Sequence, residues 1–231
     1  MKPDMNDPLL HYVYDPLCGW CYAASPLVKA AVANGIGIKL HGGGLWGIPT
    51  SLVAEKRSHI QMNDQRIAEL TGLPFEPAYL NKLLDDPATI FWSHPTIAAV
   101  LAAGALRNGA DLDMLHAIQT GHYVQGRKVV EEGVLANLAI QIGLAADDFA
   151  TTIRNIHVAE HIHNSRHLMT LHGIKGFPGF VLEHEGRFTR VRHERFYGNP
   201  EAFATELRTI TKLTLEKAGS DQPTGSTTSL A

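Results

Sequence analysis

Cysteine is scarce in this sequence: only Cys18 and Cys21 occur among its 231 residues. Neither has a partner elsewhere in the chain, and a disulfide between them would close a very short loop. Such a loop contributes roughly 2 kcal/mol to stability, against about 4.7 for a loop of a hundred residues. The absence of other cysteines therefore argues against a structural disulfide and favours a chemical role for this pair.

The sequence also lacks a long apolar run and a cluster of basic residues. No segment approaches the roughly 20 apolar residues that cross a bilayer. Lysines and arginines are scattered, and the formal net charge is −3. We therefore expect neither a membrane nor nucleic acid among the partners. The hydrophobic content of 45% is near the globular average, which predicts one large domain or a domain with a substantial insertion.

An apolar segment is missing from the start of the chain as well. Residues 1–8 contain acids and prolines where a secretory signal peptide needs its apolar region. We therefore expect a cytoplasmic protein, and in the cytosol a Cys-x-x-Cys pair is far more often catalytic than structural. A periplasmic form stays open if a leader has been removed.

The two cysteines form the motif Cys18-Gly19-Trp20-Cys21, between a predicted strand and a predicted helix. If the helix begins near Gly19, Cys18 lies at its N-terminus, where free backbone N–H groups stabilise a thiolate. Cys21 lies one turn further along, close enough to attack a mixed disulfide on Cys18. We predict that Cys18 is the nucleophile and Cys21 the resolving thiol. Gly19 keeps the approach open, and Trp20 offers an apolar face to the substrate.

Inert buried thiols and a metal site are the alternatives for this motif. The pairs His157/His161 and His163/His167 have the spacing of the second half of a zinc site, but they lie far from the cysteines in sequence. Both pairs fall in one predicted helix, on different sides, which is typical of a solvated and partly titrating surface. We predict no metal site and no bound cofactor.

The order of predicted elements indicates an α/β fold. A strand at 11–14, a helix at 21–34 and a strand at 36–40 form a β-α-β unit, which predicts a parallel pair. A hairpin with its turn at Glu185-Gly186 follows late in the chain, at 180–182 and 187–192. The last helix is predicted to start at 199–201, with Asn199 as its N-cap, and to be completed by 203–217. Residues 218–231 have no periodicity and are predicted to be disordered. The helices predicted between the β-α-β unit and the hairpin span 54–70, 77–84, 93–107, 111–123, 134–142 and 147–171.

The segment Gly176-Phe177-Pro178-Gly179 comes directly before the late hairpin. Proline at the start of a strand, beside flexible glycines, is where a cis X-Pro bond is most plausible. An ordinary trans turn beside a core aromatic residue is the alternative.

These features together resemble the DsbA family, and within it the cytosolic members known as predicted protein-disulfide isomerases. The resemblance rests on Asp-Pro-Leu-Cys-Gly-Trp-Cys-Tyr at 15–22, Thr-Gly-Leu-Pro-Phe at 71–75 and Gly-Phe-Pro at 176–178, and it covers roughly residues 11 to 215. It implies a thioredoxin-like fold formed by residues 11–50 and 174–217, with residues 51–173 as a mostly helical insertion.

The resemblance also implies roles for the late proline segment. In the family this proline is cis and lies across from the cysteines, and the residue before it offers backbone hydrogen bonds to a substrate strand. Phe177 and Pro178 are therefore expected to form a substrate clamp. Gly179 departs from the family, in which a hydroxyl residue is common at this position. Asp15 could accept a proton from Cys21, although an acid before a proline is more often a turn former.

The sequence thus predicts a thiol–disulfide oxidoreductase that acts on protein or small-molecule disulfides and thiols. The Gly-Trp dipeptide lacks the histidine of the periplasmic oxidase, which favours the reductase or isomerase direction. We expect a reduction potential between roughly −270 and −120 mV, nearer the first. Two alternatives remain open: a glutathione-dependent kappa-type transferase or hydroxychromene-carboxylate isomerase, whose first catalytic position is usually serine, and a redox-silent protein-binding module.

Overall fold

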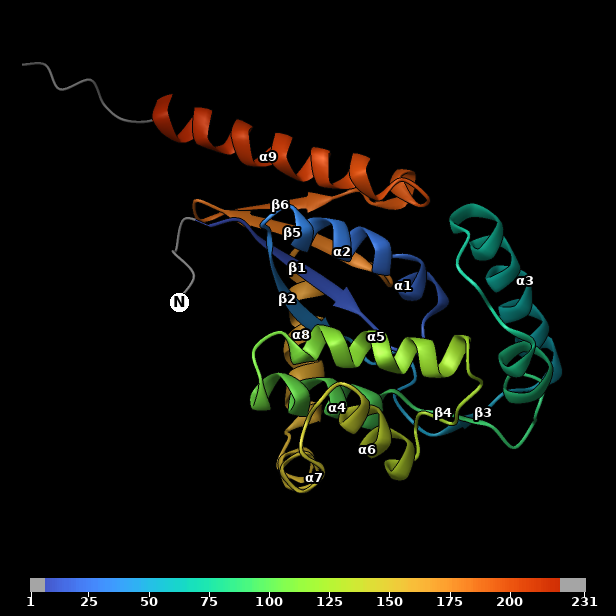
Figure 1. Ribbon diagram of the computed structural model, residues 1–231. Coiled ribbons are helices and arrows are strands. Elements are labelled where there is room, and N and C mark those ends of the chain that lie inside the picture. Colours follow the sequence, from blue (N-terminus) through green and yellow to red (C-terminus); the bar gives the residue numbers. More distant parts are fainter. Residues whose placement is uncertain (1–6, 221–231) are drawn as a thin grey trace, which may run out of the picture.

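The computed structural model describes residues 7–220, with side chains up to residue 215 (Figure 1). Of the tail predicted to be disordered, residues 221–231 lie outside this range. Residues 218–220 continue the last helix, α9 (Pro200–Ser220), beyond its predicted end. Asn199 caps this helix as its sequence suggests, because its side-chain oxygen accepts the N–H of Ala202 at 3.1 Å.

A four-stranded sheet of order β2-β1-β5-β6 positions the cysteines and the late proline segment. The central strand β1 (Leu9–Tyr14) pairs in parallel with β2 (Gly37–Gly42) and antiparallel with β5 (Gly179–His184). β5 forms a hairpin with β6 (Arg187–Val191) across Glu185 and Gly186, both of which have positive φ. The predicted parallel pair and the predicted hairpin are therefore confirmed.

Helices cover both faces of this sheet. The predicted helix after β1 is divided into α1 (Gly19–Ala23) and α2 (Ser25–Ala33), with Pro26 in the first turn of α2, where its missing N–H has no helical partner to lose. α2 packs against α9 on one face, and α8 (Val158–Leu171) contacts β2 from the other side (Figure 1). Among the described residues, no helix is long and apolar enough to cross a membrane.

The segment between β2 and β5 is mostly helical, as predicted. It also contains two short strands that the sequence did not indicate, β3 (Thr50–Ser51) and β4 (Ile90–Phe91), which pair antiparallel. The remaining elements are α3 (Ala54–Thr71), the π-helix η1 (Tyr79–Leu83), α4 (Ser93–Leu106), α5 (Ala110–Tyr123), α6 (Glu132–Gln141) and α7 (Ala146–Arg154).

The prediction of one long helix over 147–171 is wrong. The chain leaves the helix between α7 and α8, where His157 has a non-helical ψ of 65°. Asn155 ends α7 by donating its side-chain N–H to the carbonyl oxygen of Thr151 at 3.0 Å, and Ile156 packs against the core. The helix therefore breaks where Ile156 packs against the core, and no glycine or proline in the sequence marks the break.

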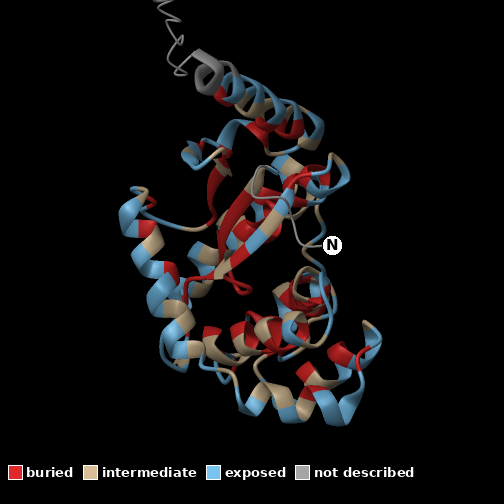
Figure 2. Ribbon diagram, turned by 90° about the vertical axis from the view of Figure 1, so that its left-hand side faces the viewer, coloured by how far each residue is buried: buried red, intermediate tan, exposed pale blue. Residues whose placement is uncertain are grey.

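One apolar cluster joins the sheet to the helical segment. The central strands β1 and β5 are mostly buried, whereas the edge strands β2 and β6 are partly exposed (Figure 2). The cluster extends from Tyr12 and Phe180 to Ile118 and Tyr123 of α5. The ring of Tyr22 stacks on that of Tyr123 with centroids 4.9 Å apart. The helix that carries the cysteines is therefore held by both the sheet and the helical segment.

Candidate active site

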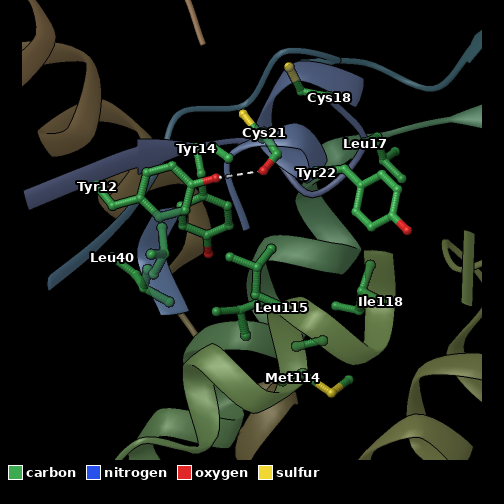
Figure 3. Close-up of a cluster of buried hydrophobic side chains, with 14 of the residues drawn as sticks. Tyr12, Tyr14, Leu17, Cys18, Cys21, Tyr22, Leu40, Met114, Leu115 and Ile118 are labelled. Atoms are coloured by element: carbon green, nitrogen blue, oxygen red, sulfur yellow. Dashed lines mark hydrogen bonds between the residues drawn. The ribbon is translucent and has the colours of Figure 1, made fainter. Parts of the chain in front are cut away.

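Cys18 is the N-cap residue of α1, the position that the sequence predicts. Its backbone is extended, and its carbonyl oxygen accepts the N–H groups of Cys21 and Tyr22 at 2.9 and 3.0 Å. Both cysteines are free thiols on the same short helix (Figure 3). The Cys18 residue is 8% exposed and Cys21 is 0% exposed, so only Cys18 is open to a molecule outside.

Cys21 is enclosed by the backbone of β1 and the turn that follows it. The N–H of Asp15 donates to its Sγ at 3.4 Å, and the hydroxyl of Tyr12 donates to its carbonyl oxygen at 3.0 Å (Figure 3). Burial, followed by the hydrogen bond and charge of Cys18, raises the pKa of the Cys21 thiol well above its usual value. Cys21 is therefore protonated at neutral pH.

The late proline segment lies beside Cys18. The Phe177–Pro178 peptide bond is cis, and the thiol of Cys18 donates to the carbonyl oxygen of Phe177 at 3.9 Å. The Phe177 ring lies against Gly43, where a side chain would collide with it, and under the guanidinium of Arg166, 5.1 Å from the ring centroid. Two other segments of the chain thus hold Phe177 in place.

Glycine at positions 19 and 179 is explained by close packing. A Cβ at Gly19 would lie 2.5 Å from Oδ1 of Asp64, so this glycine allows the close approach of helix α3. A Cβ at Gly179 would lie 2.5 Å from Cγ2 of Ile174. Glycine at position 179, in place of the hydroxyl residue that is common in the family, therefore leaves room for Ile174.

Trp20 lines two cavities, and the centroid of its ring is 5.2 Å from that of Tyr197. The proline-side cavity, about 400 Å³, is lined by Trp20, Lys175, Phe177, Pro178, Arg190 and others. The insertion-side cavity, about 380 Å³, is lined by Cys18, Gly19, Trp20, Lys56, Asp64, Tyr79 and others. Five of the six predicted site residues line these cavities, and the sixth, Cys21, is buried and lines neither.

Asp15 anchors the loop around the motif. Its fully buried carboxylate accepts the N–H groups of Leu17 at 2.9 Å and Leu45 at 2.6 Å, and the hydroxyl of Ser93. Burial raises its pKa, and these hydrogen bonds together with the charge of Arg166 oppose that rise. Because its carboxylate is held by three donors, Asp15 fits the turn-forming role considered for it.

Sequence reasoning missed a second buried acid, Asp64 of α3. Its side chain accepts the hydroxyl of Tyr79 at 2.7 Å, and burial raises the pKa of this carboxyl to about 7, although the Tyr79 bond opposes the rise. A signal was present in the sequence, because Ile60, Asp64 and Ile67 recur on one face of a helix. A carboxyl on an otherwise apolar face indicates a special environment.

The histidines form no metal site with the cysteines. Among the described residues, no group of three or more His, Cys, Asp or Glu side chains is placed to hold a metal ion. The interpretation of these histidines as a solvated surface is wrong for His161, whose Nε2 accepts the N–H of Gly42 at 2.9 Å. Burial lowers the pKa of His161, so this side chain supports β2 in its neutral form.

Comparisons with known proteins agree with this geometry. The cytosolic disulfide reductase DsbM from Pseudomonas aeruginosa is 42% identical to this chain, with 89% of this chain and 99% of that chain covered and a TM-score of 0.81. The structure of DsbM with GSH gives 41% identity, coverage of 88% and 99%, and a TM-score of 0.79.

A 2-hydroxychromene-2-carboxylate isomerase is 13% identical and shares the fold alone, with coverage of 93% and 100% and a TM-score of 0.57. A comparison with curated protein sequences gave no match. Residues 10–205 match the family described as the DSBA-like thioredoxin domain. With this match, the observed fold and a relative of 42% identity, the chain belongs to the family of DSBA-like thioredoxin domains.

Proposed function

We propose that this protein is a thiol–disulfide oxidoreductase that works as a reductase or isomerase, with Cys18 as the attacking thiol and Cys21 as the resolving thiol. The observation that carries this proposal is the unequal burial of two thiols within one helical turn. Cys18 borders a cavity, whereas Cys21 is sealed behind it. A disulfide substrate can therefore reach Cys18 first.

The proposed reaction has two exchange steps. The thiolate of Cys18 attacks one sulfur of the substrate, the substrate S–S bond breaks, and one thiol leaves. Cys21 then attacks Sγ of Cys18, which releases the second thiol and leaves a Cys18–Cys21 disulfide. Two electrons pass from the dithiol to the substrate. The raised pKa of Cys21 supports this order, because a protonated thiol does not compete for the substrate.

Gly19, Trp20, Phe177 and Pro178 form the substrate-binding surface in this proposal. The carbonyl oxygen of Phe177 faces Sγ of Cys18 and can accept a hydrogen bond from a bound substrate strand. Trp20 borders both cavities and offers an apolar surface.

Disulfides that contain glutathione are the small-molecule substrates that we favour. Glutathione carries two carboxylates, and the basic side chains that border the two cavities are Lys56, Arg66, Lys175 and Arg190. The structure of the Pseudomonas aeruginosa relative with GSH supports the same choice. That relative is named cytosolic, and we place the reaction in the cytoplasm, where the thiol pool keeps accessible dithiols reduced.

Redox equilibration against glutathione, followed by mass spectrometry, tests this function. We expect a potential between roughly −270 and −120 mV, nearer the first, with measurable insulin reduction or refolding of scrambled ribonuclease. Brief alkylation should label Cys18 before Cys21. A potential near the upper value without insulin reduction would reverse the proposed direction, and preferential labelling of Cys21 would reverse the proposed roles.

A further inference from the structure

We propose that Asp64 is a further catalytic residue, which gives a proton to the thiolate that leaves when Cys18 attacks a substrate disulfide. In the reverse direction, Asp64 takes the proton of an incoming thiol. This inference rests on the proposed function. It assigns a chemical role to helix α3 of the inserted segment, which carries no cysteine.

Asp64 lines the same cavity as the reacting sulfur, and its carboxyl approaches the residue next to Cys18. Asp64 and Cys18 line the same insertion-side cavity. Oδ1 of Asp64 lies 2.5 Å from the position that a Cβ on Gly19 would occupy, and Gly19 is the residue next to Cys18. A substrate sulfur that reaches Cys18 through this cavity therefore comes close to the carboxyl.

One oxygen of this carboxyl is available for proton transfer. The Tyr79 hydroxyl occupies Oδ2 at 2.7 Å, whereas Oδ1 accepts no hydrogen bond from the residues that the structure describes. Asp15 differs, because three donors hold its carboxylate. Of the two buried acids near the motif, Asp64 is thus the one with a free oxygen at the cavity.

The surroundings of Asp64 keep both of its protonation states accessible. The residue is 2% exposed and has no ion pair within the described part of the chain. Burial raises its pKa to about 7, where a group can both give and take a proton. The titratable groups that face it or share its cavity are Cys18 on α1, Lys56 and His59 on α3, Tyr79 on η1 and Tyr123 on α5.

The proposed step balances in atoms and charge. The Cys18 thiolate forms a bond to one substrate sulfur while the substrate S–S bond breaks, and the electron pair of that bond goes to the other sulfur. The protonated Asp64 gives its proton to this sulfur, so a neutral thiol leaves and Asp64 becomes a carboxylate. The attack of Cys21 then completes the reduction as described above, and its own proton goes to the second leaving thiolate.

The dependence on the leaving group tests this role. Glutathione disulfide releases a basic thiolate that gains from a proton donor, whereas 5,5′-dithiobis(2-nitrobenzoate) releases an acidic aromatic thiolate that does not. We expect Asp64→Asn to lower kcat/KM for glutathione disulfide about a hundredfold and for the aromatic disulfide less than about threefold. The control is Glu69→Gln, an exposed acid on the same helix, which should match the wild type.

The outcomes separate the two proposals. Equal losses with both disulfides would make Asp64 a structural residue and overturn the inference, as would no loss with either. If the wild-type protein reduces neither disulfide, the proposed function fails instead.

A second variant tests the role of Asp64 without replacing Asp64 itself. Tyr79→Phe deletes the hydrogen bond that lowers the pKa of Asp64. The part of the pH–rate profile governed by Asp64 should therefore move to higher pH with glutathione disulfide. An unmoved profile in a folded Tyr79→Phe protein would overturn the inference.

Discussion

The proline-side and insertion-side cavities have nearly the same volume, about 400 and 380 Å³, but they differ in chemistry. The proline-side cavity offers the backbone around Phe177 and the positive charges of Lys175 and Arg190. The insertion-side cavity holds Cys18 and Asp64, the groups to which we assign thiol and proton transfer. Three of the four lysines and arginines that border the cavities lie on the proline-side cavity, so we infer that recognition of substrate charge and reaction at sulfur use mainly separate surfaces.

Trp20 lines both cavities, and two other segments hold it in place. The Tyr197 hydroxyl donates to the carbonyl oxygen of Trp20 at 3.2 Å, and the guanidinium of Arg66 lies 5.9 Å from the centroid of its ring. These contacts come from the segment before α9 and from α3. The middle of the Cys-Gly-Trp-Cys motif is therefore fixed from both sides.

Among these predictions, replacement of the attacking sulfur in the insertion-side cavity should have the largest effect on activity. We expect Cys18→Ser to lower the rate of glutathione disulfide reduction by at least about a thousandfold, because a hydroxyl is a far weaker nucleophile at neutral pH. The matched variant Cys21→Ser should instead accumulate a mixed disulfide on Cys18, visible as added mass. A Cys18→Ser protein that keeps its activity would show that the insertion-side cavity is not the site of reaction.

The raised pKa of Asp64 also makes folding stability depend on pH. A folded-state pKa of about 7 against roughly 3.9 in the unfolded chain means that the folded state binds more protons between these values. Stability should therefore fall as the pH rises from about 4 to 7, by up to roughly 4 kcal/mol, and fall no further from this group above that range. Urea unfolding of Asp64→Asn and wild type at several pH values measures the difference.

The same measurement can contradict the assignment. The stability of Asp64→Asn relative to wild type should increase with pH across this range, because asparagine has no proton to lose. A constant difference between the two proteins would mean that Asp64 is ionised throughout.

Closing the space between α1 and α3 should have an intermediate effect. Gly19→Ala would bring a methyl group against Asp64 and Ile67, which we expect to cost about 1–3 kcal/mol in the free energy of unfolding. Gly133→Ala is the matched control, because this glycine also lies near the start of a helix and has open space around it. The control should be neutral or stabilised by up to about 1 kcal/mol. Equal effects on stability would contradict the close approach of α3.

Removal of a charge from the proline-side cavity should have the smallest effect. Lys175 is exposed, and Lys175→Ala should raise KM for glutathione disulfide roughly threefold while leaving kcat unchanged. The effect should shrink at high salt. Lys82→Ala, exposed and outside both cavities, is the control. A change in kcat instead of KM would contradict the proposal that the proline-side cavity binds the substrate and the insertion-side cavity carries the reaction.

The sequence predicted those parts of the fold that have local signals. The strand before the motif, the Glu185-Gly186 hairpin and the Asn199 cap depend on residues close together in the chain. The division between α7 and α8 was missed because no glycine or proline marks it, although Ile156 packs against the core at this point. β3 and β4 were missed because two-residue strands have no periodicity to detect.

The site residues, too, could be predicted only where the signal lies in neighbouring residues or in a family motif. Spacing alone indicated Cys18 and Cys21, and the family resemblance indicated Phe177 and Pro178. Asp64 contacts the motif only through the approach of α3 to Gly19, a tertiary contact between distant residues. The side-chain environment that raises its pKa exists only in the folded protein.

The sheet order, in which β1 pairs with a strand from the far end of the chain, also affects how the protein is made. Phe177, whose carbonyl faces Cys18, comes 159 residues after it in the sequence. A ribosome that adds about 5–20 residues per second needs roughly ten to thirty seconds to cover that distance. Throughout this interval the nascent chain carries both thiols while β1 lacks its partner β5. Both thiols are therefore present during synthesis before the surface that we expect to select their substrates has formed.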